Sequence, residues 1–157
     1  MTTLKRLAAG TFAMLAGLTL ALTVSAGTAQ AVAVEGCSLR FDYWSGTKTT
    51  PYDSGGADAW INGRCNGEVY YKVNFNAYGE ELRLEDRHTD GRRARTIVEV
   101  YNGDNLKDTD VFANAGTETY NLGTPDGSGN IPEGYRVEMR LCVGDIGCSS
   151  DFAWGRA

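Results

Sequence analysis

Apolar and polar side chains alternate over three long segments, and this alternation restricts the fold more than any other feature of the sequence. Every second residue is apolar in 37–43, 69–77 and 135–143. A period of two places one row of side chains against a core and the opposite row outward. No stretch after residue 31 has apolar residues at helical spacing over three turns, so we expect sheets and almost no helix.

Shorter strands and tight turns fill the rest of the sequence. Asn-Gly and Asp-Gly pairs mark turns, because these residues tolerate positive φ angles; the pairs lie at 62–63, 66–67, 90–91 and 102–103. Strands 69–77, 81–87 and 93–101 are joined by short connections and are expected to form an antiparallel meander. Further short strands are predicted at 57–62, 108–113, 117–122 and 151–154.

Eight or so short strands with frequent turns predict an all-β fold. We expect an antiparallel β-sandwich with two disulfides, with a closed β-barrel as the alternative. Trp60 and Trp154 are expected in the core. The segment Ile-Pro-Glu-Gly-Tyr-Arg-Val at 131–137 resembles the turn and following tyrosine that open a late strand in immunoglobulin-like sandwiches. This resemblance implies an architecture and no activity.

The N-terminal 31 residues have the three zones of a secretory signal peptide. Lys5 and Arg6 precede an apolar stretch, which ends in the small-residue pattern Ala29-Gln30-Ala31. Cleavage is expected after Ala31 or two residues later. An uncleaved membrane anchor is the alternative, but threonines and glycines interrupt the apolar stretch. Residues 32–157 then form a single secreted domain, with no membrane attachment after cleavage.

All four cysteines follow the predicted signal peptide. An even number of cysteines in an exported chain predicts disulfides, and four cysteines allow three pairings. Cys142 and Cys148 enclose a short glycine-containing loop, which favours their pairing and leaves Cys37 with Cys65. A zinc site would need closely spaced ligand pairs, and no Cys-x-x-Cys pair is present.

The charge balance disfavours nucleic acid as a partner. Of 15 Lys and Arg residues, two lie in the signal peptide, which leaves 13 against 20 Asp and Glu, a net charge of −7. Nucleic-acid binding depends on the neutralisation of phosphates by basic residues. One basic cluster surrounds the turn at 90–91 and could bind an anionic polymer, although a solvated hairpin tip is the alternative; it comprises Arg87, Arg92, Arg93 and Arg95.

Outward-facing aromatic and amide side chains are the candidate ligand-binding residues. Strand parity places Tyr70 in one outward row with two asparagines. Aromatic faces can stack on sugar rings while amides bond to hydroxyl groups, so the pattern predicts polysaccharide binding. The alternative is that these aromatic residues reflect only the general preference of tyrosine and tryptophan for β-strands. The candidates are Trp44, Tyr52, Tyr70, Asn74 and Asn76.

No cofactor is expected, with calcium as the one alternative. The candidate calcium ligands are Asp104, Asp108 and Asp110, in an oxygen-rich segment. A second run, 126–130, has Asp, Ser and Asn at alternate positions but lacks the glycine and glutamate of a calcium loop. Enzymatic activity is not expected: His88 is the sole histidine, beside a turn, and no catalytic motif accompanies it.

These features predict a secreted, non-catalytic binding protein for a cell-surface or environmental polysaccharide. An inhibitor of an extracellular hydrolase, which presents the loop between Cys142 and Cys148, is the alternative, with an extracellular protein as partner. Three segments together resemble small exported β-proteins of high-GC Gram-positive bacteria, a resemblance that implies export and no particular activity. These segments are Thr-Ala-Gln-Ala at 28–31, the strand 135–142 and the finish 148–154.

Overall fold

The computed structural model describes residues 32–34, 37–49, 55–144 and 146–157, with the backbone alone for 32–34 and 47–49. The predicted signal peptide lies outside the described residues. The described ranges consist of strands, turns and bends with no helix, as the alternating pattern predicted. No helix in them is long and apolar enough to span a membrane.

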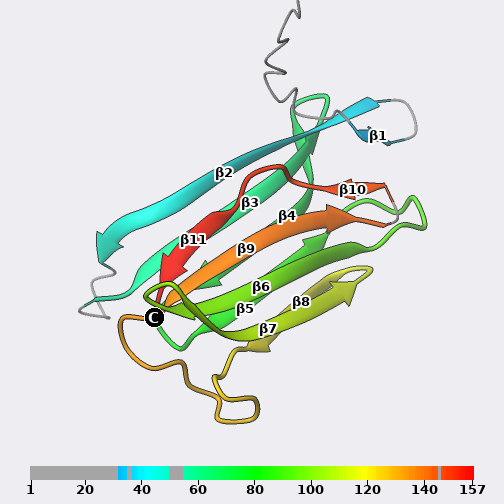
Figure 1. Ribbon diagram of the computed structural model, residues 1–157. Helices are drawn as coiled ribbons and strands as arrows, with labels where there is room; N and C mark the ends of the chain where they lie inside the picture. Colours follow the sequence, from blue (N-terminus) through cyan, green and yellow to red (C-terminus); the bar gives the residue numbers. More distant parts are fainter. Residues whose placement is uncertain (1–31, 35–36, 50–54, 145) are drawn as a thin grey trace, which may run out of the picture.

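Eleven strands follow one another along the chain (Figure 1). They are β1 (Val32–Val34), β2 (Cys37–Thr49), β3 (Ala57–Cys65), β4 (Glu68–Asn76), β5 (Glu81–Asp86), β6 (Ala94–Asn102), β7 (Asn105–Asn114), β8 (Thr117–Asn121), β9 (Arg136–Val143), β10 (Gly147–Cys148) and β11 (Ala153–Arg156).

The strands form two layers that remain connected. Strands β2, β3, β4, β5 and β8 make up one layer, here called the β4 sheet. Strands β11, β9, β6 and β7 make up the other, the β9 sheet, and Figure 1 shows this sheet in front of the first. Every pairing is antiparallel, and β11 joins the layers by pairing with β3 at Ala57.

The layers also approach each other at both lateral edges. At one edge the Trp154 backbone N–H donates to Ser45 Oγ at 3.0 Å. At the other edge the rings of Phe112 and Tyr120 stack with centroids 4.3 Å apart. The all-β antiparallel prediction is confirmed, and the nearly closed sheet combines the two layers of a sandwich with the continuity of a barrel.

The predicted meander is wrong at its third strand. Strand β5 pairs with β4 and β8, whereas β6 pairs with β7 and β9 in the other layer. Residues 87–93 therefore cross between the layers instead of forming a hairpin turn. Asn62-Gly63, also predicted as a turn, lies inside β3, where Gly63 faces the side chains of Leu39 and Tyr71.

The core lies between the inward rows of the two sheets. In β4, Tyr71, Val73 and Phe75 are at most 1% exposed, as the alternating pattern predicted. Both predicted disulfides are present: Cys37–Cys65 joins β2 to β3, and Cys142–Cys148 joins β9 to β10. The two disulfides indicate an oxidising environment.

Trp60 and Trp154 were predicted in the core, and this is wrong: both are partly buried and occupy outward rows of their strands. In β3 the inward row consists of Ala57, Ala59 and Ile61. Trp60 lies between two of these positions, so the period of two directs it to the opposite face.

Gly155 marks the closest approach of β11 to the β4 sheet. A Cβ atom at this position would overlap the Ala57 carbonyl oxygen and lie 2.6 Å from Phe75 Cδ1. We therefore expect Gly155→Ala to lower the free energy of unfolding by about 1–3 kcal/mol, because the site has no space for a methyl group. Urea denaturation measures this change. Gly116→Ala is the matched control, since a Cβ there meets nothing within 4 Å; an equal loss in both variants would contradict the close packing.

Candidate functional site

The outer face of the β4 sheet brings two tryptophans and an amide into one row. Trp44 on β2 pairs with Trp60 on β3, and Trp60 pairs with Asn74 on β4. Directly opposite residues share a face, and adjacent strands lie about 4.8 Å apart, so this tryptophan row spans about 10 Å across three strands. Trp44, Trp60 and Asn74 are thus neighbours on one surface.

Trp44 is held in place by a glycine two residues further along β2. Its side chain is 40% exposed in the folded protein. A Cβ atom built on Gly46 would lie 3.1 Å from Trp44 Cη2, so the indole lies over this position. The same Cβ atom would overlap the Asp58 carbonyl oxygen. One part of the indole is therefore fixed against the backbone while the rest faces solvent.

Two asparagines beside the tryptophans have unused acceptor atoms. Within the described residues, Oδ1 of Asn62 and Oδ1 of Asn74 are buried and accept no hydrogen bond. Asn62 pairs with Asp42, and its Nδ2 donates to Asp42 Oδ2 at 3.3 Å. Asn76, the other candidate amide, is exposed one position beyond the row on β4. Because the oxygens of Asn62 and Asn74 are buried, Asn76 is the amide of this group that is open to a donor such as a sugar hydroxyl.

Tyr70 lies apart from the row. A register shift between Gly63 and Arg64 places Val69, and not Tyr70, opposite Arg64, and Tyr70 packs partly buried against the core. The shift interrupts the alternation from which an outward position was predicted for Tyr70. Its ring stacks on His88 with centroids 4.2 Å apart, so one ring face is covered. Tyr52 lies outside the described residues. The structure thus brings Trp44 and Asn74 together and separates Tyr70 from them.

An open depression continues the outer face along β2 and β3. It has a volume of about 770 Å³ and is lined by Ser38, Arg40, Phe41, Asp42, Arg64, Asn66 and Gly67. Arg64 is fixed at its edge, because Nε donates to Asp42 Oδ1 at 2.9 Å and Nη1 donates to the Gly67 carbonyl at 3.1 Å. The depression lies beside the tryptophan row because Arg40, Asp42 and Trp44 alternate on the same side of β2.

Three of the four arginines predicted to form an anion site line one small depression, and the fourth lies apart from them. Arg87 Nε donates to Glu85 Oε2 at 2.7 Å, and Arg92 Nη1 donates to Asp90 Oδ2 at 3.0 Å. Arg93 lines a small depression with these two arginines. Arg95 pairs with Cys142 on the β9 sheet and does not line it.

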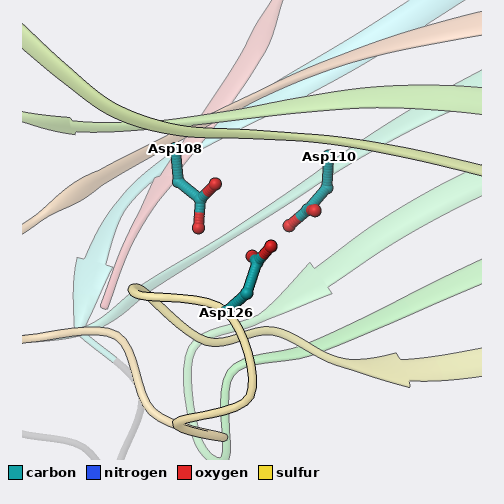
Figure 2. Close-up of side chains that lie close together, drawn as sticks. All are labelled: Asp108, Asp110 and Asp126. Carbon is teal, nitrogen blue, oxygen red and sulfur yellow. The ribbon is translucent and has the colours of Figure 1, made fainter.

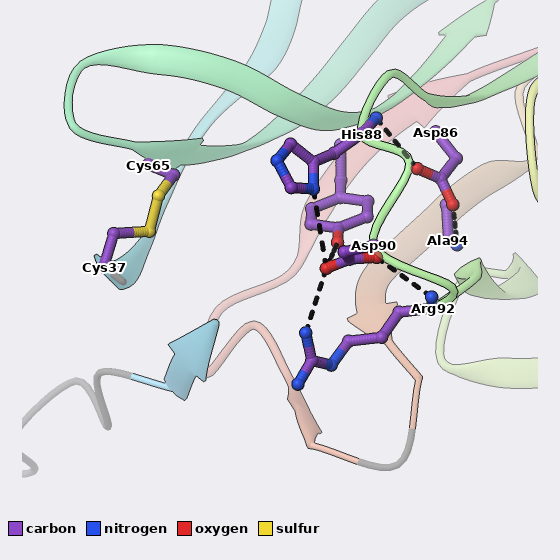
Figure 3. Close-up of polar contacts among 8 residues, drawn as sticks. Cys37, Cys65, Asp86, His88, Asp90, Arg92 and Ala94 are labelled. Carbon is purple, nitrogen blue, oxygen red and sulfur yellow. Dashed lines mark hydrogen bonds and ion pairs between the residues drawn. A yellow bond between two sulfur atoms is a disulfide. The ribbon is translucent and has the colours of Figure 1, made fainter. Parts of the chain in front are cut away.

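The crossing between the layers is organised by two carboxylates (Figure 3). Asp86 accepts from the His88 N–H at 3.1 Å and from the Ala94 N–H at 3.2 Å, and burial raises the pKa of Asp86 despite these bonds. Asp90 accepts from the Tyr71 hydroxyl and the Arg92 N–H, both at 2.9 Å.

Burial raises the pKa of Asp90, but its hydrogen bonds outweigh burial and bring that pKa below its ordinary value. The ring of His88 stacks on Tyr70, and its Nδ1 lies 3.6 Å from Asp90 Oδ2. Asp86 and Asp90 accept hydrogen bonds from backbone N–H groups of the crossing, so these two carboxylates have a structural role.

Three carboxylates from distant parts of the sequence converge at the edge of β7. Asp108 and Asp110 occupy the inward row of β7, and Asp126 approaches from the connection between β8 and β9 (Figure 2). One oxygen of each lies within 4.8 Å of the others. Burial, and then the neighbouring carboxylates, raise the pKa of Asp110. Asp104, the third residue of the sequence hypothesis, lies outside this cluster, and Asp126 occupies its place.

This acidic cluster has two explanations. Carboxylate oxygens are the ligands that calcium prefers, and calcium takes six or more oxygens in all. The hydroxyl of Thr124 lies beside the cluster and donates to Asp108 Oδ2 at 3.2 Å. Inward-pointing charges on an edge strand also hinder the pairing of edges from different molecules. The cluster could hold a cation, and the edge explanation requires none.

The raised pKa of Asp110 predicts a pH-dependent stability. A carboxyl group whose pKa is higher in the folded state favours the folded state at low pH, and this contribution is lost as the pH rises through the folded pKa. In the presence of EDTA we expect Asp110→Asn to raise the urea midpoint at pH 7 and to leave it unchanged at pH 3.

Asp104→Asn, at an exposed position outside the cluster, is the matched control. A lower midpoint of Asp110→Asn at pH 7 in EDTA would contradict the repulsion between the carboxylates. Added calcium that raises the wild-type midpoint, but not that of Asp110→Asn, would identify a bound cation.

The loop between Cys142 and Cys148 folds back on the β9 sheet. Gly147 pairs with Val143, and Ile146 packs partly buried against the core. The Gly144 N–H donates to the Arg93 carbonyl at 2.9 Å. Asp145, the middle of the loop, lies outside the described residues.

The function of this chain has to be inferred from its own residues. The outer face of the β4 sheet combines the tryptophan row, the neighbouring asparagines and the adjoining depression. It is the surface on which the structure gathers most of the candidate ligand-binding side chains. No protein-family model, no curated protein and no solved structure matches this chain.

Proposed function

We propose that this chain is a secreted, non-catalytic protein that binds a polysaccharide on the outer face of the β4 sheet. The observation that carries the proposal is the tryptophan row, in which Trp44 and Trp60 lie on adjacent strands beside Asn74. Exposed indole faces can cover the apolar face of a sugar ring, and the exposed amide of Asn76, beyond the row on β4, can bond to its hydroxyls.

The strands that carry the two tryptophans are covalently joined. The Cys37–Cys65 disulfide links the start of β2 to the end of β3, and Asp42 bonds to Asn62 and Arg64 between the disulfide and the row. Binding to a rigid surface loses less conformational entropy than binding to a flexible one. This cross-linking supports recognition by a preformed face.

The ion pairs on this face favour binding without hydrolysis. Asp42 bonds to Arg64, and Glu85 pairs with both Arg83 and Arg87. A general acid in glycoside hydrolysis must reach the leaving-group oxygen with its carboxyl group. The carboxylates on this face are already engaged with guanidinium groups of the protein, and Glu85 is 5% exposed, which supports binding without hydrolysis.

Inhibition of an extracellular hydrolase is the second candidate and has less support. The disulfide-closed loop would have to present its apolar residue to a partner, but Ile146 packs against the core of its own chain. Secretion itself is inferred from the predicted signal peptide together with the two disulfides.

Removal of the exposed indole tests the proposed function. We expect the wild-type protein to be retained by at least one polymer in a glycan array or an insoluble-polysaccharide pull-down, and Trp44→Ala to weaken binding about tenfold or more, as truncation of a central aromatic residue commonly does. Phe152→Ala is the control, since Phe152 is a partly exposed aromatic residue that stacks on Arg140 of the β9 sheet.

Retention on no polymer would refute the proposal. Equal retention of Trp44→Ala and the wild-type protein would refute it as well. Thermal unfolding of both variants verifies that they are folded at the temperature of the binding measurement.

A further inference from the structure

Positive charge is concentrated at one end of the outer face of the β4 sheet, beside the depression, although the chain as a whole is acidic. The chain contains 20 Asp and Glu against 15 Lys and Arg. The three rows that run from the depression to the tryptophans reverse this balance, with four basic residues and two carboxylates. The basic residues are Arg40, Arg64, Lys72 and Arg83, and the carboxylates are Asp42 and Glu85.

Two of the basic residues are placed directly opposite each other. Arg40 on β2 pairs with Arg64 on β3, and like charges at directly opposite positions destabilise a sheet. Asp42 offsets only one of them, because its carboxylate bonds to the Arg64 guanidinium at 2.9 Å. Among the described residues, no carboxylate is paired with Arg40, which is exposed at the depression.

The second carboxylate on this face is also fully used. Glu85 is 5% exposed, and its two oxygens pair with Arg83 and Arg87. Neither carboxylate of these three rows is therefore paired with Arg40. An anion in the depression would meet the exposed guanidinium of Arg40 and the fixed guanidinium of Arg64, and guanidinium groups bind carboxylates and sulfates through parallel hydrogen bonds.

We infer that the polysaccharide is anionic and that the depression around Arg40 binds its carboxylate or sulfate groups. This inference rests on the proposed function. Arg40 and Trp44 lie on the same side of β2, four residues or about 13 Å apart. A polymer that lies along β2 therefore contacts the indole with one sugar and Arg40 with the charged group of another.

Two matched pairs of polymers test the inference. Polygalacturonate is compared with its methyl ester, which has the same backbone without the charge, and dextran sulfate is compared with dextran. Affinity electrophoresis should show tighter binding to at least one charged polymer than to its neutral partner. Stronger binding to polygalacturonate identifies carboxylate as the recognised group, and stronger binding to dextran sulfate identifies sulfate.

Substitutions at the depression localise the effect. Arg40→Gln should weaken binding to the charged polymer about tenfold, as expected for the loss of a charge-assisted hydrogen bond, and should leave binding to the neutral polymer unchanged. Arg40→Lys should lose less, since it keeps the charge without the planar fork. Arg95→Gln is the control, because it removes one exposed positive charge from the β9 sheet.

The outcomes separate this inference from the proposed function. Equal binding of charged and neutral polymers, or an equal loss in Arg95→Gln and Arg40→Gln, overturns the anionic subsite. Sensitivity to Trp44→Ala under those same conditions leaves polysaccharide binding intact. Binding to no polymer at all overturns both. Because Arg40 is exposed and lies opposite Arg64, Arg40→Lys should unfold near the wild-type temperature and Arg40→Gln at that temperature or above it, which a thermal melt verifies.

Discussion

The arrangement of the two layers depends on the buried carboxylate of Asp86. One of its oxygens accepts from the N–H of His88 at the start of the crossing, and the other accepts from the N–H of Ala94, where β6 begins. This carboxylate closes the crossing and directs β6 into the second layer. Burial makes its charge unfavourable, as its raised pKa shows, and two backbone donors offset part of that penalty. The β4 sheet keeps an open outer face because β6 is placed elsewhere.

The alternation of side chains was sufficient to predict most of the strands, although the Asn62-Gly63 pair wrongly ended one of them, and the cysteine spacing was sufficient to predict the disulfides. The partner of each strand was harder to predict, because the short turn signal at Asp90-Gly91 is compatible with a hairpin and with a crossing. In the folded protein Asp90 accepts a hydrogen bond from the hydroxyl of Tyr71, 19 residues earlier in the chain. Such a contact joins residues that a local sequence pattern does not relate.

The candidate site was predicted in part. Parity placed Trp44 and Asn74 outward. Trp60 was assigned to the core, although the alternation through Ile61 and Asn62 indicates an outward position for it. Two of the three residues of the acidic cluster could be predicted, because Asp108 and Asp110 alternate on one strand. Asp126 joins them through the long connection before β9, whose path has no sequence signal. The free charge of Arg40 became apparent only when its cross-strand partner was known.

The contact between Trp44 and Gly46 restricts which residues can occupy these two positions in a related sequence. A side chain at position 46 would both lift the indole and overlap the Asp58 carbonyl. A smaller residue at position 44 would leave the backbone of Gly46 uncovered. Related chains that keep this strand pairing should therefore keep glycine at position 46 wherever an aromatic residue occupies position 44, and this pair of residues would mark the face in an alignment.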